Sequence, residues 1–276
     1  MNFQAFWLTS LFVLSTISGC LTANETSEQA ELRLATTTSM RDSGVLDLLI
    51  QEFKEAHDIE VEYVAVGTGA ALVLGENKDV DALLVHAPSL EMQFIEEGHG
   101  TNRTMIAWNR FVLLSPQNFN GSIFDVFETI NNEEQCFISR GDFSGTHHKE
   151  QAIWRALNET RGLEVTEDSN GLHPSGEWYY SIGQGMGAAI NMANEKNCAT
   201  LSDRGTALNF QEDVELLRLE FTDEHLYNPY SFIELSGPES EAANLFLEYL
   251  LGPGQLTIER YEIKGEAAFF SLGTSD

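Results

Sequence analysis

The sequence predicts an α/β protein with parallel strands, and two observations support that prediction. Short apolar runs that read as buried strands alternate along the chain with stretches whose apolar residues recur at helical spacing, a pattern typical of βαβ units. The composition is 42% hydrophobic with unremarkable glycine and proline contents, as expected of a folded chain. About 245 residues follow the N-terminal segments described next, enough for one large domain or for two lobes that each bury a core.

The first 20 residues read as an export signal. Residues 6–17 are almost wholly apolar but too few to span a membrane, and residues 17–20, Ile-Ser-Gly-Cys, resemble the lipobox of bacterial-type lipoproteins. Cys20 would then be lipidated, and the polar residues 21–30 would tether an exported domain at the cell surface or in the periplasm. Residues 1–10 lack the usual lysine or arginine, so a simple cleaved signal or an uncleaved anchor stays an alternative.

The charge balance excludes one class of partner. The chain has 43 acidic and 15 basic residues, which give a formal net charge of −28. Nucleic acid is therefore not expected as a partner, because contacts with phosphates need a basic surface. A surface of this kind suits solubility in high salt, where the repulsion between like charges is screened.

In the first half of the chain, expected strands end where polar and glycine-rich segments begin. Strands are expected at 32–35, 59–66 and 80–85, and Ser39 with Asp42 would form a capping box at the start of the first helix. In a parallel sheet, ligands bind beyond the carboxyl ends of the strands. The segments that fall there are 36–39, 67–69 and 86–87. The alternative is that the threonines are only β-branched strand ends and helix caps.

In the second half, the chain is expected to cross between two lobes and to return. An apolar strand at 111–115 would make the first crossing, and residues 226–232 would make the second. The polar, acidic residues 159–173 are interpreted as a surface insertion. The other expected elements are strands at 136–139, 178–180 and 199–202, a glycine-rich helix start at 183–189, and a closing amphipathic helix at 242–250.

The stretch 139–147 is the strongest candidate for a binding site. It places a glycine-punctuated turn between a strand and a helix, and the first N–H groups of that helix have no intrahelical partners and carry partial positive charge. Ser144, Gly145 and Thr146 would offer hydroxyls and bare amides to an anion there. The alternative is an ordinary capped helix with a salt bridge on the surface.

Two arginines are candidates for binding the charge of an anion. Arg140 lies in the turn, where its planar fork suits an oxyanion and Asp142 could hold the fork in place. Arg204 follows another expected strand and would supply a second cation, unless it braces its own loop through Asp203. An anion binder this acidic cannot attract its ligand from a distance, so its affinity has to come from such local donors.

Cys136 and Cys198 are predicted to form a disulfide. With Cys20 assigned to lipid, they are an even pair in an oxidising compartment, and each lies just before a strand that ends in an Arg-Gly turn. If those strands are neighbours in a parallel sheet, their spacing of about 4.8 Å is within the range that a disulfide tolerates. The alternative is a pair of buried free thiols.

Taken in order, these motifs resemble those of the tungstate-binding, TupA-type substrate-binding proteins of ABC transporters. The resemblance covers residues 32–250 and rests on the segments 36–39, 66–69, 84–86, 139–147, 183–187 and 203–206. It implies a two-lobed periplasmic-binding-protein fold of type II, with a mostly parallel, helix-flanked sheet in each lobe. It further implies that a tetrahedral oxyanion, tungstate or molybdate, binds in the cleft between the lobes, with no catalysis, no cofactor and no metal site.

The resemblance also implies a division of the chain and a set of partners. Residues 31–110 and 228–276 would form lobe 1 and residues 111–227 lobe 2, and the lobes would close on the ligand by bending at the two crossings. The expected partners are an ABC permease and ATPase and, through the lipid anchor, a membrane, with the chain as a monomer. The expected ligand-binding residues are Thr38, Ser39, Thr68 and His86 from lobe 1 and Arg140, Ser144, Gly145, Thr146 and Arg204 from lobe 2.

A phosphate-binding protein of the same superfamily is the nearest alternative, because it shares the pattern Arg-x-Asp-x-Ser-Gly-Thr. Phosphate is partly protonated at neutral pH and benefits from an acceptor, whereas tungstate and molybdate are fully deprotonated and need donors only. The position at which phosphate relatives carry a carboxylate resembles that of His86, which can donate. This comparison favours tungstate or molybdate.

A hydrolase that uses Ser144 with His147 or His148 is the alternative of a different class. Residues three or four apart at a helix start point along one face, and no third orienting group is evident beyond Asp142. The two histidines also lack the further partners that a metal site needs. We therefore expect that the protein is not an enzyme.

Overall fold

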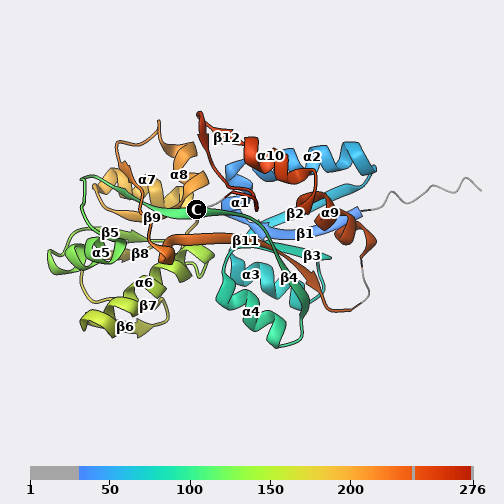
Figure 1. Cartoon of the computed structure of the whole chain (residues 1–276). Coiled ribbons are helices and arrows are strands. Elements are labelled where there is room, and N and C mark those ends of the chain that lie inside the picture. The colour runs from blue at the N-terminus through green and yellow to red at the C-terminus, as the bar shows by residue number, and fades with distance from the viewer. Residues whose placement is uncertain (1–30, 238–239, 275–276) are drawn as a thin grey trace, which may run out of the picture.

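The computed structural model describes residues 31–237 and 240–274 and has the expected α/β architecture (Figure 1). The export signal, the tether and Cys20 lie outside the described residues. In the first part of the fold β1 lies between β2 and β3 and is parallel to both. Its elements are β1 (Glu31–Thr37), α1 (Thr38–Ser43), α2 (Val45–His57), β2 (Glu60–Val66), α3 (Thr68–Glu76), β3 (Ala82–Val85) and α4 (Pro88–Glu96).

Two long strands connect the halves of the molecule. β4 (Gly100–Ser115) pairs antiparallel with β11 (Tyr227–Leu235), which also pairs antiparallel with β3. The far end of β4 pairs antiparallel with β9 (Thr200–Asp203) and β10 (Leu217–Leu219). The first crossing strand therefore begins at Gly100, well before the expected 111–115. The large sheet, in the order β10-β4-β11-β3-β1-β2 with β9 on β4, is mixed rather than mostly parallel, because the crossing strands run against their neighbours.

The chain between the crossings forms the second half of the molecule. There β5 and β8 are parallel, as expected. The interpretation of residues 159–173 as an insertion was incomplete, since 159–161 complete α6 and the rest contributes the hairpin β6–β7. The elements are α5 (Ile123–Asn132), β5 (Phe137–Ser139), α6 (Gly145–Arg161), β6 (Val165–Asp168), β7 (Gly171–Pro174), β8 (Tyr179–Ser181), α7 (Met186–Lys196), α8 (Arg204–Phe210) and the 3-10 helix η1 (Glu224–Leu226).

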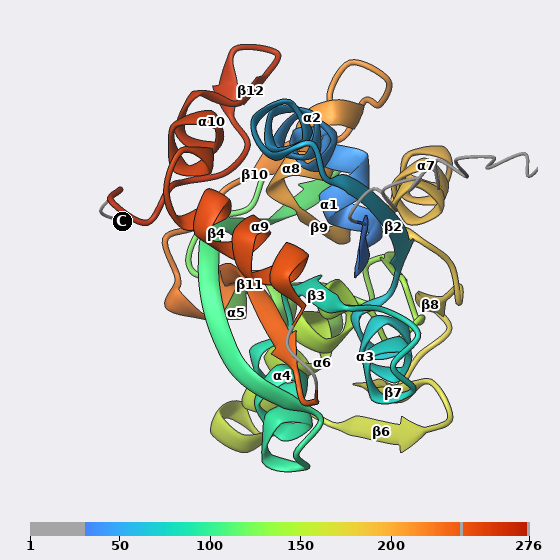
Figure 2. The ribbon, with the colours of Figure 1, turned by 90° about the vertical axis from the view of Figure 1, so that its right-hand side faces the viewer.

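Helices cover both faces of the sheet in the first half (Figures 1 and 2). α9 (Glu241–Leu251) and α10 (Gly254–Arg260) join α2 on one face, and α3 and α4 cover the other. The C-terminal hairpin of β12 (Glu262–Ile263) and β13 (Glu266–Ala267) follows. No helix in the described part of the chain is long and apolar enough to cross a membrane.

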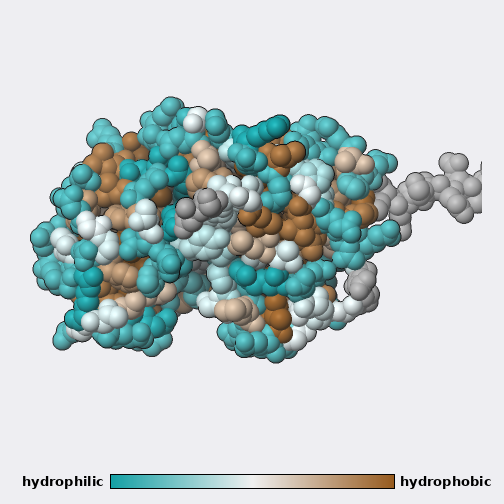
Figure 3. Space-filling view, in the orientation of Figure 1, coloured by the Kyte–Doolittle hydropathy of each residue, from teal (hydrophilic) through white to brown (hydrophobic). Residues whose placement is uncertain are grey.

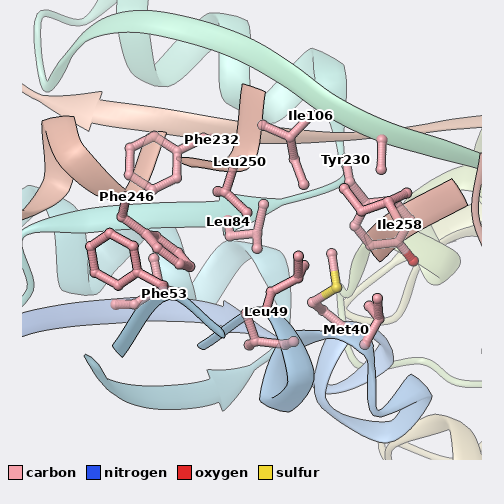
Figure 4. Close-up of a cluster of buried hydrophobic side chains, with 14 of the residues drawn as sticks. Met40, Leu49, Phe53, Leu84, Ile106, Tyr230, Phe232, Phe246, Leu250 and Ile258 are labelled. Atoms are coloured by element: carbon pink, nitrogen blue, oxygen red, sulfur yellow. The ribbon is translucent and has the colours of Figure 1, made fainter. Parts of the chain in front are cut away.

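Each half buries an apolar core. In the first half Phe53, Phe232 and Phe246 lie fully buried between the sheet and the helices α2 and α9 (Figure 4). In the second half Phe127 and Trp154 pack together with ring centroids 4.6 Å apart. Burying a side chain of this size contributes about 1.5–3 kcal/mol, so each half has its own source of stability. The lobe boundaries themselves stay a prediction.

Cys136 and Cys198 form a disulfide in the structure. Their Cα atoms are 4.6 Å apart, and the sequence separation is 62 residues. Phe137 and Ala199, the residues that follow them, form a parallel bridge, so the cysteines lie at the amino ends of neighbouring strands. The bond therefore fixes the end of the second half that is remote from the carboxyl ends of β5 and β9.

Removing this disulfide should lower the melting temperature. A loop of this length contributes about 4 kcal/mol on the chain-entropy model, and less in practice, so we expect the variant Cys136→Ser/Cys198→Ser to melt about 5–10 °C below the wild type. A free-thiol assay on the unfolded, unreduced wild-type protein should detect neither cysteine. Two reactive thiols from these positions would contradict the prediction.

Candidate functional site

The carboxyl ends of the parallel strands in the first half meet at one edge of the sheet. Thr37 is opposite Val66 in the register of β1 and β2, and Thr36 is opposite Leu84 of β3. The chain enters α1, α3 and α4 from these neighbouring positions. The amino ends of the three helices therefore lie at the edge where α/β proteins bind ligands.

Ser39 and Thr68 are fully buried at this edge, and neither hydroxyl has a hydrogen-bond partner among the described residues. The capping box expected at Ser39 is wrong, because the N-cap of α1 is Thr37, whose side chain accepts the N–H of Met40. Ser39 is thereby left with a hydroxyl that no local cap uses. Thr38 is the first residue of α1 and is partly buried.

Arg140 and Asp142, in the second half, form the ion pair that the sequence suggested. The side chain of Arg140 is 2% exposed, and its Nη2 and Nε atoms donate to Oδ2 of Asp142 at 2.6 and 3.2 Å. Oδ1 of Asp142 accepts the N–H of Ser144 at 3.2 Å. Both carboxylate oxygens are thus occupied, whereas Nη1 and one N–H of Nη2 have no acceptor among the described residues.

The helix after this turn begins as the sequence predicts. Ser144 is the N-cap of α6, and its Oγ accepts the N–H of His147 at 3.4 Å. Gly145 and Thr146 are the first two residues of the helix and are buried. The hydroxyl of Thr146, like those of Ser39 and Thr68, has no partner in the described structure. An unpaired buried hydroxyl is costly, so these three groups, among the nine buried side-chain atoms without a partner in the described structure, are candidates to donate to a ligand.

The two halves touch at this point. An ideal Cβ atom placed on Gly67 would lie 3.6 Å from Cα of Ser144, and one placed on Gly145 would lie 2.9 Å from Cε1 of His86. The amino ends of α3 and α6 therefore face each other across the boundary between the halves. The structure thus brings Gly67 and His86 of one half against Ser144 and Gly145 of the other, and the binding of a ligand by these residues stays a prediction.

His86 is held by a chain of buried polar groups. Its Nδ1 is 2.9 Å from Oδ1 of Asn228, whose Nδ2 donates to Oδ1 of Asn109 and to Oδ2 of Asp203. Because a carboxylate can only accept, the amide nitrogen of Asn228 must face Asp203, and its oxygen faces the imidazole. The proton of His86 is therefore on Nδ1.

The donor role expected for His86 is not supported by this arrangement. Burial lowers the pKa of His86, and the carboxylate of Asp203 and the bond to Asn228 offset this only in part. In the neutral ring with its proton on Nδ1, the other nitrogen is an acceptor. The ring stacks on Tyr230 at 4.7 Å between centroids and covers Gly145 on the other half.

Arg204 does not reach the site, contrary to the expectation. Its Nη1 lies 2.5 Å from the carboxylate of Glu220 and its Nη2 3.3 Å from that of Glu266, while its Nε donates to the carbonyl of Ala267 at 2.8 Å. The guanidinium is turned to Glu220, which follows β10, and to the C-terminal segment, where Glu266 and the carbonyl of Ala267 lie. It therefore braces that segment, through partners other than the Asp203 that the sequence suggested.

A buried network that the sequence analysis missed lies behind the site. Oδ2 of Asp203 accepts from Asn109 at 2.8 Å, from Asn228 at 3.1 Å and from the hydroxyl of Tyr230 at 2.6 Å. Its Oδ1 accepts the N–H of Thr206 at 3.1 Å. The sequence signal was the presence of asparagines within otherwise apolar crossing strands. Because four donors surround the carboxylate, hydrogen bonds compensate its negative charge, and it repels a nearby anion less than an unpaired carboxylate would.

Of the residues considered for catalysis, Ser144 and His147 are not arranged for it. Oγ of Ser144 accepts from the backbone of His147, and Nδ1 of His147 accepts the N–H of Phe143 at 3.0 Å. The imidazole is therefore not placed to take a proton from Ser144. Within the described residues no group of three or more His, Cys, Asp or Glu side chains could hold a metal ion.

Comparison with known proteins agrees with the fold. A family described as "PBP superfamily domain" matches residues 22–253. The curated "Tungstate-binding protein TupA" of Peptoclostridium acidaminophilum is 37% identical over 228 residues, which cover 80% of this chain and 75% of that protein. A "Putative ABC transporter anion-binding protein" of Haloferax volcanii is 36% identical over 263 residues, 89% of this chain and 73% of that one.

A solved structure is similar along the same length. The tungstate ABC transporter protein from Geobacter sulfurreducens superposes with a TM-score of 0.72 at 36% sequence identity, covering 84% of this chain and 98% of that one. The family match over residues 22–253 includes the crossing strands β4 and β11 and the starts of α1, α3 and α6.

Proposed function

The chain belongs to the PBP superfamily and, within it, to the TupA-type tungstate-binding proteins, and we propose from this premise that it binds tungstate or molybdate outside the cytoplasm for an ABC importer. Its relatives are solute-binding proteins of transporters, which are not enzymes. We further propose that it acts with a permease and an ATPase, as a monomer held to a membrane by lipid on Cys20.

The observation that carries this proposal is the set of unpaired donors. The hydroxyls of Ser39, Thr68 and Thr146 are buried and have no hydrogen-bond partner in the part of the chain that the structure describes, and Arg140 is almost fully buried beside the amino end of α6. These groups come from both halves of the chain. A tetrahedral dianion is the ligand class that such a set fits, because it accepts at every oxygen and balances the buried cation.

Phosphate is the second candidate, and one observation favours it. Nε2 of His86 is an acceptor in the neutral ring, and a protonated phosphate could donate to it. Against phosphate, the carboxylates of Asp142 and Asp203 are occupied by other donors and cannot serve as the acceptor. We therefore place tungstate and molybdate first.

Isothermal titration of the purified protein with tungstate, molybdate, sulfate and phosphate at pH 7.5 tests the proposal. We expect tungstate and molybdate to bind at least about a hundredfold more tightly than phosphate, the difference of about 2.7 kcal/mol that one mismatched buried hydrogen bond to a charged group can give. A chain that prefers phosphate would overturn the assignment. Equal affinity for sulfate would show that the site recognises only charge and shape.

A further inference from the structure

A groove lies between the two halves beside the proposed site. It is lined by residues 86–89 and Met92 on one side and by Gly145, His148, Lys149 and Ala152 of α6 on the other, and its volume is about 330 Å³. Figure 3 shows the molecule hollowed between its halves along the lower edge, where α4 and α6 face each other in Figure 1. None of the residues that line the groove carries a carboxylate, although the chain has 43 acidic residues.

Lys149 is the strongest positive charge in this groove. Its Nζ donates to the carbonyl of Tyr227 at 3.3 Å and lies 5.6 Å from the centre of the Phe111 ring. No carboxylate of the described residues lies within ion-pair distance of it, whereas exposed Lys54 is paired with Glu60. A half-buried lysine usually has a carboxylate near it, and Lys149 has none among the described residues although the chain is strongly acidic. A bound anion would supply the missing counter-charge.

The position of Lys149 relates it to the ligand. It follows Gly145 by four residues, so both lie on the same face of α6, with Lys149 about 6 Å further along the helix. His86 and Gly145, which touch across the halves, line the groove at the end nearer the proposed site. An anion in the groove would thus be one helical turn from the amides at the start of α6.

We propose that this groove is an entry site at which a tetrahedral oxyanion dianion first binds, with Lys149 as its counter-charge, before it moves to the donors at the start of α6. The proposal rests on the proposed function and deepens it. A chain with a net charge of −28 repels dianions at long range, so a local region of opposite sign is needed for fast association. A groove with low-dielectric walls, one ammonium and no carboxylate supplies it.

Stopped-flow association kinetics with tungstate, read by tryptophan fluorescence, test the entry site. At pH 7 and low ionic strength, Lys149→Gln should slow the association rate constant about four- to tenfold and change the dissociation rate constant less than twofold. The difference should vanish in about 1 M NaCl, where the Debye length is about 3 Å. Lys54→Gln, which changes the net charge equally on α2, is the matched control and should associate like the wild type.

A charge-conserving variant separates the charge from the packing of the side chain. Burial lowers the pKa of Lys149 to about 8, so the association rate of the wild type should fall as the pH rises from 7 to 9. The histidines around it do not titrate in that window, because burial lowers the pKa of His86 and of His148. Lys149→Arg should associate at the wild-type rate at pH 7 and keep it at pH 9.

The outcomes distinguish this proposal from the function on which it rests. If the wild type binds tungstate and Lys149→Gln associates at the wild-type rate, the entry site is wrong and the proposed function stands. If Lys149→Gln instead raises only the dissociation rate, Lys149 belongs to the final site, and the entry role is equally overturned. A wild type that binds none of the oxyanions overturns both. A thermal melt of each variant shows that it is folded.

Discussion

Arg140→Ala should raise the dissociation constant for tungstate at least tenfold. The guanidinium is 2% exposed and keeps free N–H groups beside the start of α6, so its loss removes a charge-assisted hydrogen bond worth about 1.5–3 kcal/mol. A second effect adds to the first. Asp142 loses its cation while its other oxygen still accepts from Ser144, which leaves a partly buried negative charge beside a dianion. Isothermal titration of the folded variant measures the sum.

Two further variants separate the contributions to this loss of affinity. Arg140→Ala/Asp142→Asn removes the stranded charge and should recover part of the affinity, because the amide can no longer repel the ligand. Arg204→Ala is the matched control, since it deletes another mostly buried arginine whose partners are Glu220, Glu266 and Ala267. It should bind tungstate within about threefold of the wild type. If Arg204→Ala and Arg140→Ala weaken binding equally, the site is misplaced.

The sequence predicted the fold through its strongest local signals. Alternating strands and helices, the turn at 139–147 and the two crossing segments correspond to elements of the structure. The direction and extent of the crossing strands were not accessible, because an apolar run does not tell whether its partner strand is parallel or antiparallel. The extension of β4 back to Gly100 includes polar residues such as Asn102 and Arg103. They interrupt the apolar run by which a buried strand is recognised in a sequence.

Positions at the site were easier to predict than the direction of individual side chains. Arg140 and Arg204 both follow strands and precede glycine, yet only Arg140 has an acceptor within its own turn, while the partners of Arg204 come from residues 220 and 266–267. His86 shows the same limit. Its tautomer depends on Asn228, which is 142 residues away in the sequence. Long-range partners of this kind decide chemistry that a local motif cannot show.

Gly145→Ala should weaken tungstate binding about five- to hundredfold without destabilising the fold. A Cβ atom at this position would lie 2.9 Å from Cε1 and 3.1 Å from both ring nitrogens of His86, closer than real contacts allow. The ring cannot easily yield, because Asn228 holds its Nδ1 and Tyr230 stacks on its face. The two halves would have to separate, at an overpacking cost of about 1–3 kcal/mol. Alanine has a higher helix propensity than glycine, so the half of the molecule that contains α6 should be no less stable in the variant.

The test is whether the penalty disappears when His86 is made small. In the background of His86→Ala, the three atoms nearest to the added methyl group are gone, so Gly145→Ala should change the affinity less than about twofold. Gly185→Ala is the control, since this glycine likewise lies at the start of a helix, as the N-cap of α7, but has nothing within 4 Å of an added Cβ. Small-angle scattering should show that tungstate compacts the wild type and Gly185→Ala, but not Gly145→Ala. If Gly145→Ala binds and compacts normally, contact between Gly145 and His86 is not part of the ligand-bound state, and closure must use another pair of surfaces.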